Sequence, residues 1–320
     1  MSLIVMFLLF IFGLILIIKG SDWFVDSAIW IAKVFRIPDI IIGATLVSFS
    51  TTLPELFVST SSAINGDTSM ALGNAIGSVA CNTALILGFA IILTTPTLLH
   101  KKTISIKANS ISLLLLLIFS VGYINGYISR SLGIILFLLT FVFVYYNYDI
   151  AKKHRKITKK TDDVDTCKKT VIKNIILFTV GLVFTIFGAH LIVVYGAKIA
   201  IELNVPSIII GVSMTALGTS LPELVTSIAA IKKNAAALSI GNIFGANILN
   251  LTLVVGSTAI IKPIIMTKDI LSIHLPIILG ITLIIVIGTI ISRKKYSKIL
   301  GIILLSSYIG YMILNIIIAV

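Results

Sequence analysis

Two stretches of this chain are nearly identical: STTLPELFVS at residues 50–59 and GTSLPELVTS at residues 218–227. Each places a Pro-Glu pair inside a long apolar segment, so Glu55 and Glu223 occupy equivalent positions. An ionised carboxylate near the centre of a bilayer costs at least about 2 to 3 kcal/mol on insertion scales, and is expected to face a cavity and a cationic partner. Two repeated sites of this kind indicate a pathway for cations.

The composition is that of an integral membrane protein. Hydrophobic residues make up 58% of the chain and charged residues 12%, and the mean hydropathy is +1.14; soluble domains lie far from these values. A run of about 20 apolar residues crosses a bilayer. Runs of this kind lie near residues 3–34, 40–64, 69–94, 106–124, 131–148, 172–203, 207–231, 235–261, 270–291 and 297–319. We therefore expect an all-α fold of ten membrane-spanning helices in the cell membrane, with the lipid bilayer as its surroundings.

The first run is expected to be an uncleaved span, because no basic residue precedes it and no small-residue cleavage site follows it. Its second part, residues 22–35, could instead lie at the membrane interface without changing the count.

The net charge of +13 reflects membrane topology and does not indicate a nucleic-acid partner. Most of the 25 Lys and Arg residues fall in alternate loops, the pattern that sets orientation in membranes. It predicts that both termini lie outside. Residues 151–173 form a basic cytoplasmic linker between a first half at 1–150 and a second half at 174–320. Cys81 and Cys167 lie too far apart in this topology for a disulfide, and no cofactor or obligatory protein partner is indicated.

The two halves are repeats. A constant offset of 168 residues relates Gly20–Gly88 to the second half without gaps, and it pairs Pro54 with Pro222 and Asn82 with Asn250. Five spans per half is an odd number, so the second copy must cross the membrane in the opposite sense. Inverted repeats in secondary transporters place substrates and ions near the midplane, between broken helices of both halves.

Each Pro-Glu helix carries a polar stripe at spacings of three and four residues. Its members are Ser48, Thr51, Thr52, Glu55 and Ser59 in the first half and Ala216, Thr219, Ser220, Glu223 and Ser227 in the second. Pro54 and Pro222 lack an N–H, so each helix should bend there and free main-chain oxygens. Two carboxylates with hydroxyl and carbonyl oxygens suit six- to eight-coordinate Ca²⁺, and subsets of them suit Na⁺.

The spans that follow add amides at equivalent positions. Asn74, Ser78 and Asn82 form a second stripe, and its counterparts are Asn242, Ala246 and Asn250. Such residues can simply hold helices together, but beside two glutamates we interpret them as neighbours of an ion site. Asp22 and His190, which also correspond, lie near a membrane surface and are assigned interfacial roles.

At this point the sequence resembles a family. The repeated [ST]-[ST]-L-P-E segment and the G-N-x-x-G-[SA]-x-x-x-N segment after it look like the alpha repeats of the calcium/cation antiporters, which include sodium/calcium exchangers. The resemblance implies alternating access, with the first and sixth spans sliding past a core of the other eight. It implies ion ligands at Glu55, Glu223, Thr51, Thr219, Ser48, Ala216, Thr52, Ser220, Ser78, Asn82 and Asn250.

Two departures from the family pattern matter. Many sodium-coupled members carry an aspartate where this chain has Asn82 or Asn250, and an amide supplies no charge. Ala246 stands where a hydroxyl is expected, so an outer sodium would rely on carbonyls, Asn247 or water. Both changes favour fewer sodium ions or protons as the counter-ion.

The sequence thus predicts an antiporter that exchanges Ca²⁺ for Na⁺. A Ca²⁺/H⁺ antiporter would need only the two glutamates, and a cation channel could use the same oxygens. An enzyme is least favoured, because the chain has no paired-aspartate, H-E-x-x-H or Ser-His arrangement.

Overall fold

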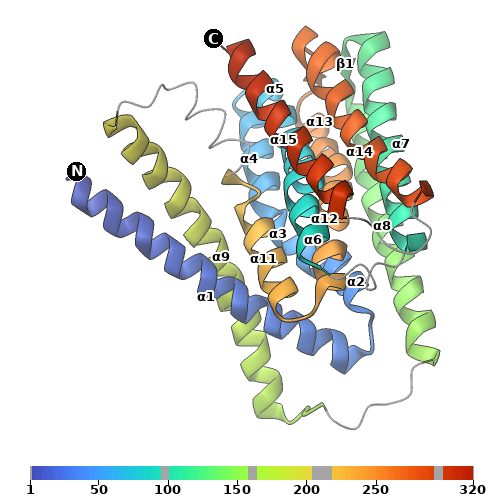
Figure 1. The fold of residues 1–320 in the computed structure, drawn as a ribbon. Helices are drawn as coiled ribbons and strands as arrows, with labels where there is room; N and C mark the ends of the chain where they lie inside the picture. Colours follow the sequence, from blue (N-terminus) through green and yellow to red (C-terminus); the bar gives the residue numbers. More distant parts are fainter. Residues whose placement is uncertain (1, 95–100, 158–163, 204–217, 292–297, 320) are drawn as a thin grey trace.

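The computed structural model describes residues 2–94, 101–157, 164–203, 218–291 and 298–319, and these ranges are almost wholly helical (Figure 1). The first half contains α1 (Leu3–Phe35), α2 (Asp39–Ile42), η1 (Gly43–Val47), α3 (Ser48–Thr51), α4 (Leu53–Ile64), α5 (Thr68–Ala80), η2 (Cys81–Ile86), α6 (Leu87–Leu93), α7 (Lys101–Asn125), β1 (Tyr127–Ile128) and α8 (Arg130–Ile157). The second contains α9 (Lys168–Glu202), α11 (Leu221–Lys232), α12 (Ala236–Leu249), η4 (Asn250–Val254), α13 (Val255–Ile261), β2 (Ile264–Ile265), η5 (Ile270–His274), α14 (Leu275–Ile291) and α15 (Lys298–Ala319).

Within the described ranges, 8 helices are long and apolar enough to cross a membrane, and the bent pair Asp39–Thr51 and Leu53–Ile64 makes a ninth. The expected span at 207–231 is described only from Gly218 onward, and the rest of it lies outside the described residues. The expected all-helical fold is found in these ranges, apart from β1 and β2, which form a short antiparallel pair with Tyr127 opposite Ile265.

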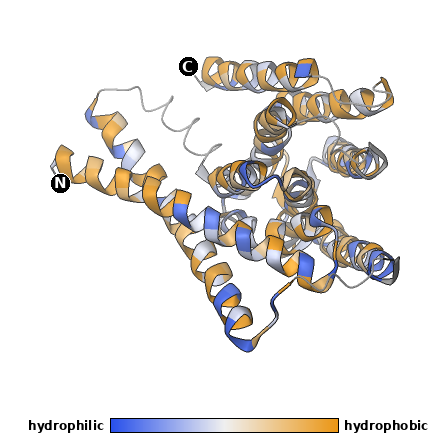
Figure 2. Cartoon of the chain, turned by 60° about the horizontal axis from the view of Figure 1, so that its bottom comes forward, coloured by the Kyte–Doolittle hydropathy of each residue, from blue (hydrophilic) through white to orange (hydrophobic). Residues whose placement is uncertain are grey.

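The long helices α1 and α9 lie side by side, outside the bundle formed by the other helices (Figure 1). Residues 22–35 continue α1 without a break, and their position at the membrane interface stays an alternative. Figure 2 shows both helices coloured mainly as hydrophobic, with hydrophilic residues in the second part of α1 and at both ends of α9. Apolar outer surfaces of this kind suit contact with lipid.

Glycines set how closely these two helices approach. A Cβ added to Gly20 would lie 2.7 Å from the carbonyl oxygen of Gly181, and one added to Gly13 would lie 3.0 Å from that of Gly188. Backbones can approach this closely only where side chains are absent. In the repeat, Gly13 corresponds to Gly181 and Gly20 corresponds to Gly188. The two contacts are therefore equivalent to each other under the repeat relation.

The bundle also contains two glycine contacts that are equivalent under the repeat relation. Gly88 in α6 packs against Gly301 in α15, and Gly256 in α13 packs against Gly133 in α8. Each pair is related to the other by the offset of 168 residues. The repeat relation therefore extends beyond Gly20–Gly88, where the sequence makes it visible, to helices whose side chains have diverged.

Candidate cation site

Both Pro-Glu segments stand where a helix begins anew. Helix α3 ends at Thr51 and α4 begins at Leu53, and the two helical segments that meet at Thr52 are bent by 42°. Pro54 has no N–H to give to the carbonyl of Ser50, so that carbonyl loses its helical partner. The predicted break is confirmed in the first half. In the second, α11 likewise begins just before Pro222, with Ser220 as its N-cap.

Glu55 and Glu223 lie in the first turns of α4 and α11, and both side chains are 0% exposed. The two carboxylates are close enough to interact electrostatically, so the fold brings the repeated acids together. Their first-turn positions place them near the positive ends of two helix dipoles, which favours negative charge there. The structure thus puts two acids from opposite halves in one buried place.

Three hydroxyls surround these carboxylates. Ser78 and Thr219 are near Glu55, and Thr51 is near Glu223. None of the three donates a well-formed hydrogen bond to a carboxylate, and all four carboxylate oxygens lack a hydrogen-bond partner among the described residues. A buried carboxylate without a partner is strongly unfavourable. The arrangement therefore calls for a cation or a proton.

Threonine and asparagine join the halves beside the acids. Thr51 Oγ1 donates to Asn242 Oδ1 at 3.2 Å, and Thr219 Oγ1 donates to Asn74 Oδ1, also at 3.2 Å. Thr51 corresponds to Thr219 and Asn74 to Asn242 in the repeat, so the two bonds are equivalent. The Asn74 amide also donates to Ser59 Oγ at 2.9 Å, which fixes its orientation. The sequence placed Asn74 and Asn242 in the polar stripe but gave no sign that they bond across the halves.

The predicted amides lie in π-helical turns. Asn82 is in η2 and Asn250 begins η4, and π turns inside α-helices are frequent at functional sites. Both side chains are fully buried, and their oxygen and nitrogen atoms have no hydrogen-bond partner among the described residues. The hydroxyls of Thr52 and Ser220 are buried without a partner in the same part of the chain that the structure describes. Buried polar atoms without a partner fit a site that holds ions.

Two predicted residues are already engaged. Asn247 gives its amide to Thr83 Oγ1 at 2.8 Å, which leaves its Oδ1 without a partner among the described residues. The carbonyl of Ser48 accepts the N–H of Thr52 at 2.9 Å, so a cation there would compete with that N–H. Ala216 lies outside the described residues.

A pocket of about 330 Å³ reaches this region from the side of α9. Pro54, Asn74, Thr219 and Pro222 line it together with His190 of α9. In the described part of the chain no group of three or more His, Cys, Asp or Glu side chains could hold a metal. Any cation bound at this place would thus meet two acids and otherwise neutral oxygens.

The sequence model of the sodium/calcium exchanger protein family matches residues 5–148 and 173–317, which is nearly everything except the basic linker. The chain belongs to this family. Membership points to a multi-pass membrane transporter rather than an enzyme.

The sequence is also similar to individual membrane proteins. The uncharacterized membrane protein MJ0091 of Methanocaldococcus jannaschii is 32% identical over 202 residues, which is 63% of this chain and 64% of that protein. The sodium/calcium exchanger MaX1 of Methanosarcina acetivorans is 41% identical over 87 residues, which is 27% of this chain and 25% of MaX1. The aligned part is less than two thirds of either relative.

The fold of this exchanger-family chain matches solved structures over almost its whole length. The sodium-calcium exchanger NCX_Mj soaked with 2.5 mM Na⁺ and 0.1 mM Ca²⁺ has a TM-score of 0.82 and 27% identity, and the match covers 97% of this chain and 98% of that one. NCX_Mj soaked with 2.5 mM Na⁺ and 10 mM Sr²⁺ gives the same TM-score at 26% identity. The resemblance stated from the repeated motifs is confirmed.

Proposed function

We propose that this protein is a secondary antiporter of the cell membrane that exchanges Ca²⁺ for Na⁺ by alternating access. The observation that carries the proposal is the pair of fully buried carboxylates, Glu55 and Glu223, whose oxygens have no hydrogen-bond partner among the described residues. Two negative charges balance one Ca²⁺ or two Na⁺, so the two cargoes compete for one site.

The proposed ligands are the oxygens gathered around the two acids. Ca²⁺ takes six to eight oxygen ligands in flexible geometry. The two carboxylates have too few oxygens for this, and hydroxyls, amides and the freed carbonyls of the broken helices supply the others. The full proposed set is Glu55, Glu223, Thr51, Thr219, Ser48, Ala216, Thr52, Ser220, Ser78, Asn82, Asn250 and Asn247. No resident cofactor or obligatory protein partner is part of the proposal.

Charge explains why the exchange is obligatory in this scheme. An empty site holds two buried negative charges, and such a state is costly in a bilayer. The change that opens the site first to one side of the membrane and then to the other is therefore unfavourable unless Ca²⁺ or sodium ions neutralise the two carboxylates. Helices α1 and α9, which lie outside the bundle, are the proposed moving part.

A Ca²⁺/H⁺ antiporter is the second candidate, and one observation favours it. Asn82 and Asn250 are both amides, so the described site contains only two acids, and each could carry a proton in place of sodium. The same two glutamates would then bind Ca²⁺ and H⁺ in turn.

Calcium-45 uptake into proteoliposomes tests both candidates. Uptake driven by an imposed Na⁺ gradient and not by a pH gradient is the expected result, and the reverse pattern would establish the proton-coupled exchanger. Glu55→Gln and Glu223→Gln should each abolish uptake, because removal of one charge leaves Ca²⁺ uncompensated. Glu202→Gln, at the exposed end of α9, is the matched control and should transport normally. Uptake near the wild-type rate in either buried variant would show that the cations bind elsewhere.

A further inference from the structure

His190 lines the pocket that reaches the candidate cation site from the side of α9. Its side chain is exposed, and none of the described residues forms an ion pair with it. The other lining residues are apolar apart from Asn74 and Thr219, and none of their side chains can ionise. Within the part of the pocket wall that the structure describes, His190 is therefore the one side chain that can carry a charge.

The pocket wall leads to the two buried carboxylates. The lining residues Pro54 and Pro222 directly precede Glu55 and Glu223, and the lining residue Thr219 is near Glu55. The carboxylate oxygens have no hydrogen-bond partner among the described residues, so their negative charge attracts cations into the pocket. A cation that enters through this pocket passes an imidazole on its way to the two acids.

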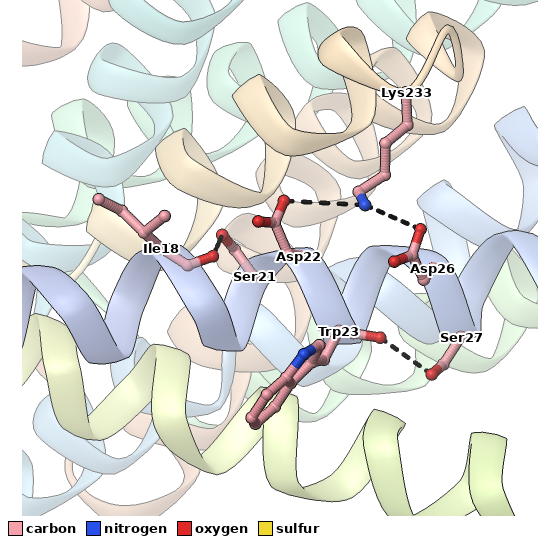
Figure 3. Close-up of polar contacts among 7 residues, drawn as sticks. All are labelled: Ile18, Ser21, Asp22, Trp23, Asp26, Ser27 and Lys233. Atoms are coloured by element: carbon pink, nitrogen blue, oxygen red, sulfur yellow. Dashed lines mark hydrogen bonds and ion pairs between the residues drawn. The ribbon is translucent and has the colours of Figure 1, made fainter.

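The equivalent position in the other half is neutralised by an ion pair. The offset of 168 residues relates His190 to Asp22. Figure 3 shows Lys233 between Asp22 and Asp26 of α1, with its Nζ 3.8 Å from Asp22 Oδ1 and 2.8 Å from Asp26 Oδ1. The counterpart of Lys233 in the repeat is Asn65, which carries no charge. A charge on His190 is therefore not balanced by the contact that balances Asp22.

Few other charges face His190. The glycine contacts between α1 and α9 place Ile11 level with His190, and Ile11 is apolar. On α9 itself the next ionisable residues are Tyr195 and Lys198, one to two turns further along. In the described wall, α4, α5 and α11 contribute no ionisable side chain to the pocket, and the nearest acids beyond it are the two buried glutamates. The charge of His190 thus acts mainly on an ion in the pocket.

We propose that His190 is a specificity-determining residue at the entrance to the cation site: its neutral form admits both Ca²⁺ and Na⁺, and its protonated form slows Ca²⁺ more than Na⁺. Histidine is the side chain whose charge changes most readily between pH 5 and 8. The sequence pattern favours an interfacial role for His190, and the pocket adds this second role. The inference rests on the proposed cation transport for its purpose, but the entry of ions can be measured without transport.

The charge of the ion decides the size of the effect. The energy needed to bring an ion past a fixed charge is proportional to the charge of the ion. One charge about 6 to 8 Å from the ion, in water-like surroundings at low salt, changes the entry rate of a monovalent ion about two- to threefold. The factor for a divalent ion is the square, about four- to tenfold. A general loss of stability would show no such dependence on ion charge.

The test measures ion entry into the full-length protein in lipid nanodiscs at low salt and pH 7.5. Rapid mixing with calcium-45 gives the rate for Ca²⁺, and ²³Na magnetic-resonance exchange gives the rate for Na⁺. His190→Asp should be fastest, His190→Gln intermediate and His190→Lys slowest, and the logarithm of the change should be twice as large for Ca²⁺ as for Na⁺. The same three substitutions at Ile201, which is exposed on α9 and does not line the pocket, should give equal rates.

The wild-type protein should match His190→Gln at pH 8 and approach His190→Lys at pH 5.5. Comparison at equal pH removes the effect of protons on the two glutamates, because all variants share it. His190→Cys in a Cys167→Ser background repeats the comparison on protein that has already folded, since Cys81 is buried. A thiol reagent that carries a trimethylammonium group should slow entry, relative to one of similar size that carries a sulfonate.

Three results would overturn the proposal: equal entry rates for all charges at residue 190, an equal response to charge at Ile201, or a wild-type protein that matches His190→Gln at both pH values. Entry of Na⁺ that follows the charge at residue 190, in a protein that binds no Ca²⁺, would support the entrance and reject the proposed cargo. Uptake of Ca²⁺ into proteoliposomes by a protein whose entry rates ignore residue 190 would do the reverse.

Discussion

Thr51 and Thr219 each give a hydroxyl proton to an asparagine of the other half. These two bonds lie beside the buried glutamates, and they tie each Pro-Glu segment to the asparagine-bearing helix of the other half, α12 for Thr51 and α5 for Thr219. Removing a donor would leave the Oδ1 of a buried asparagine without a partner, and an unpaired buried acceptor is unfavourable. Single side chains here hold the two halves of the site in register.

Thr51→Val tests this role, because valine keeps the shape and loses the hydroxyl. We expect destabilisation of about 1 kcal/mol, since interhelical hydrogen bonds in membranes contribute about 0.6 kcal/mol on average and up to about 1.7. Thermal unfolding in detergent measures it. Thr179→Val is the control, because Thr179 is exposed and bonds only within α9. Equal unfolding temperatures for the two variants would contradict a bridging role for Thr51.

Glu55 and Glu223 could be predicted as candidate site residues, because a carboxylate in an apolar membrane span is unfavourable whatever the span packs against. The Thr51–Asn242 bond could not, because it depends on how two helices from different halves face one another. Periodicity places a residue on a face of its own helix and says nothing of the facing helix. Ser48 shows the same limit, since its carbonyl already accepts the N–H of Thr52.

At the level of whole elements, the proline in each Pro-Glu segment predicts the helix break, and the structure has it at Thr52. The π turns η2 and η4 carry no such signal. Their residues continue an ordinary i, i+4 pattern, yet an extra residue in the turn redirects the side chains that follow. The direction in which the side chains of Asn82 and Asn250 point therefore depends on how the helix packs.

The crossing of α1 and α9 depends on glycine at its centre. A Cβ at Gly20 would lie 2.7 Å from the carbonyl oxygen of Gly181 and 2.7 Å from the nitrogen of Thr185, both backbone atoms that cannot move aside alone. We expect Gly20→Ala to destabilise the protein by about 1 to 3 kcal/mol. Gly310→Ala, where no atom lies within 4 Å of the new Cβ, should be neutral or stabilising by up to about 1 kcal/mol.

Thermal unfolding of the two alanine variants in the same detergent distinguishes these outcomes. Similar unfolding temperatures for Gly20→Ala and Gly310→Ala would mean that the α1–α9 crossing tolerates a methyl group. The tight backbone approach would then not be what holds the two helices together.

At the scale of the whole molecule, the contacts divide the protein into a bundle and a pair of outer helices. Aromatic contacts join α1 to α9, with Trp23 on Phe184 and Phe24 on Phe178 at ring-centroid distances of 5.7 and 4.7 Å. The bundle has its own close helix crossings at Gly88–Gly301 and Gly133–Gly256. The sequence showed the repeats and the length of the outer helices, but which helices lie outside the bundle follows only from packing.

If α1 and α9 move together past the bundle, a cross-link between them should preserve exchange and a cross-link from α1 to the bundle should stop it. Trp23→Cys with Phe184→Cys makes the first pair, and Asp26→Cys with Lys233→Cys makes the second, from positions less than one turn apart on α1. Both would be joined by the same short bifunctional thiol reagent in a Cys167→Ser background, with calcium-45 uptake as the readout. The four single-cysteine variants treated with the reagent serve as controls. Loss of uptake on joining α1 to α9, with normal uptake in those controls, would show that the two helices must move independently.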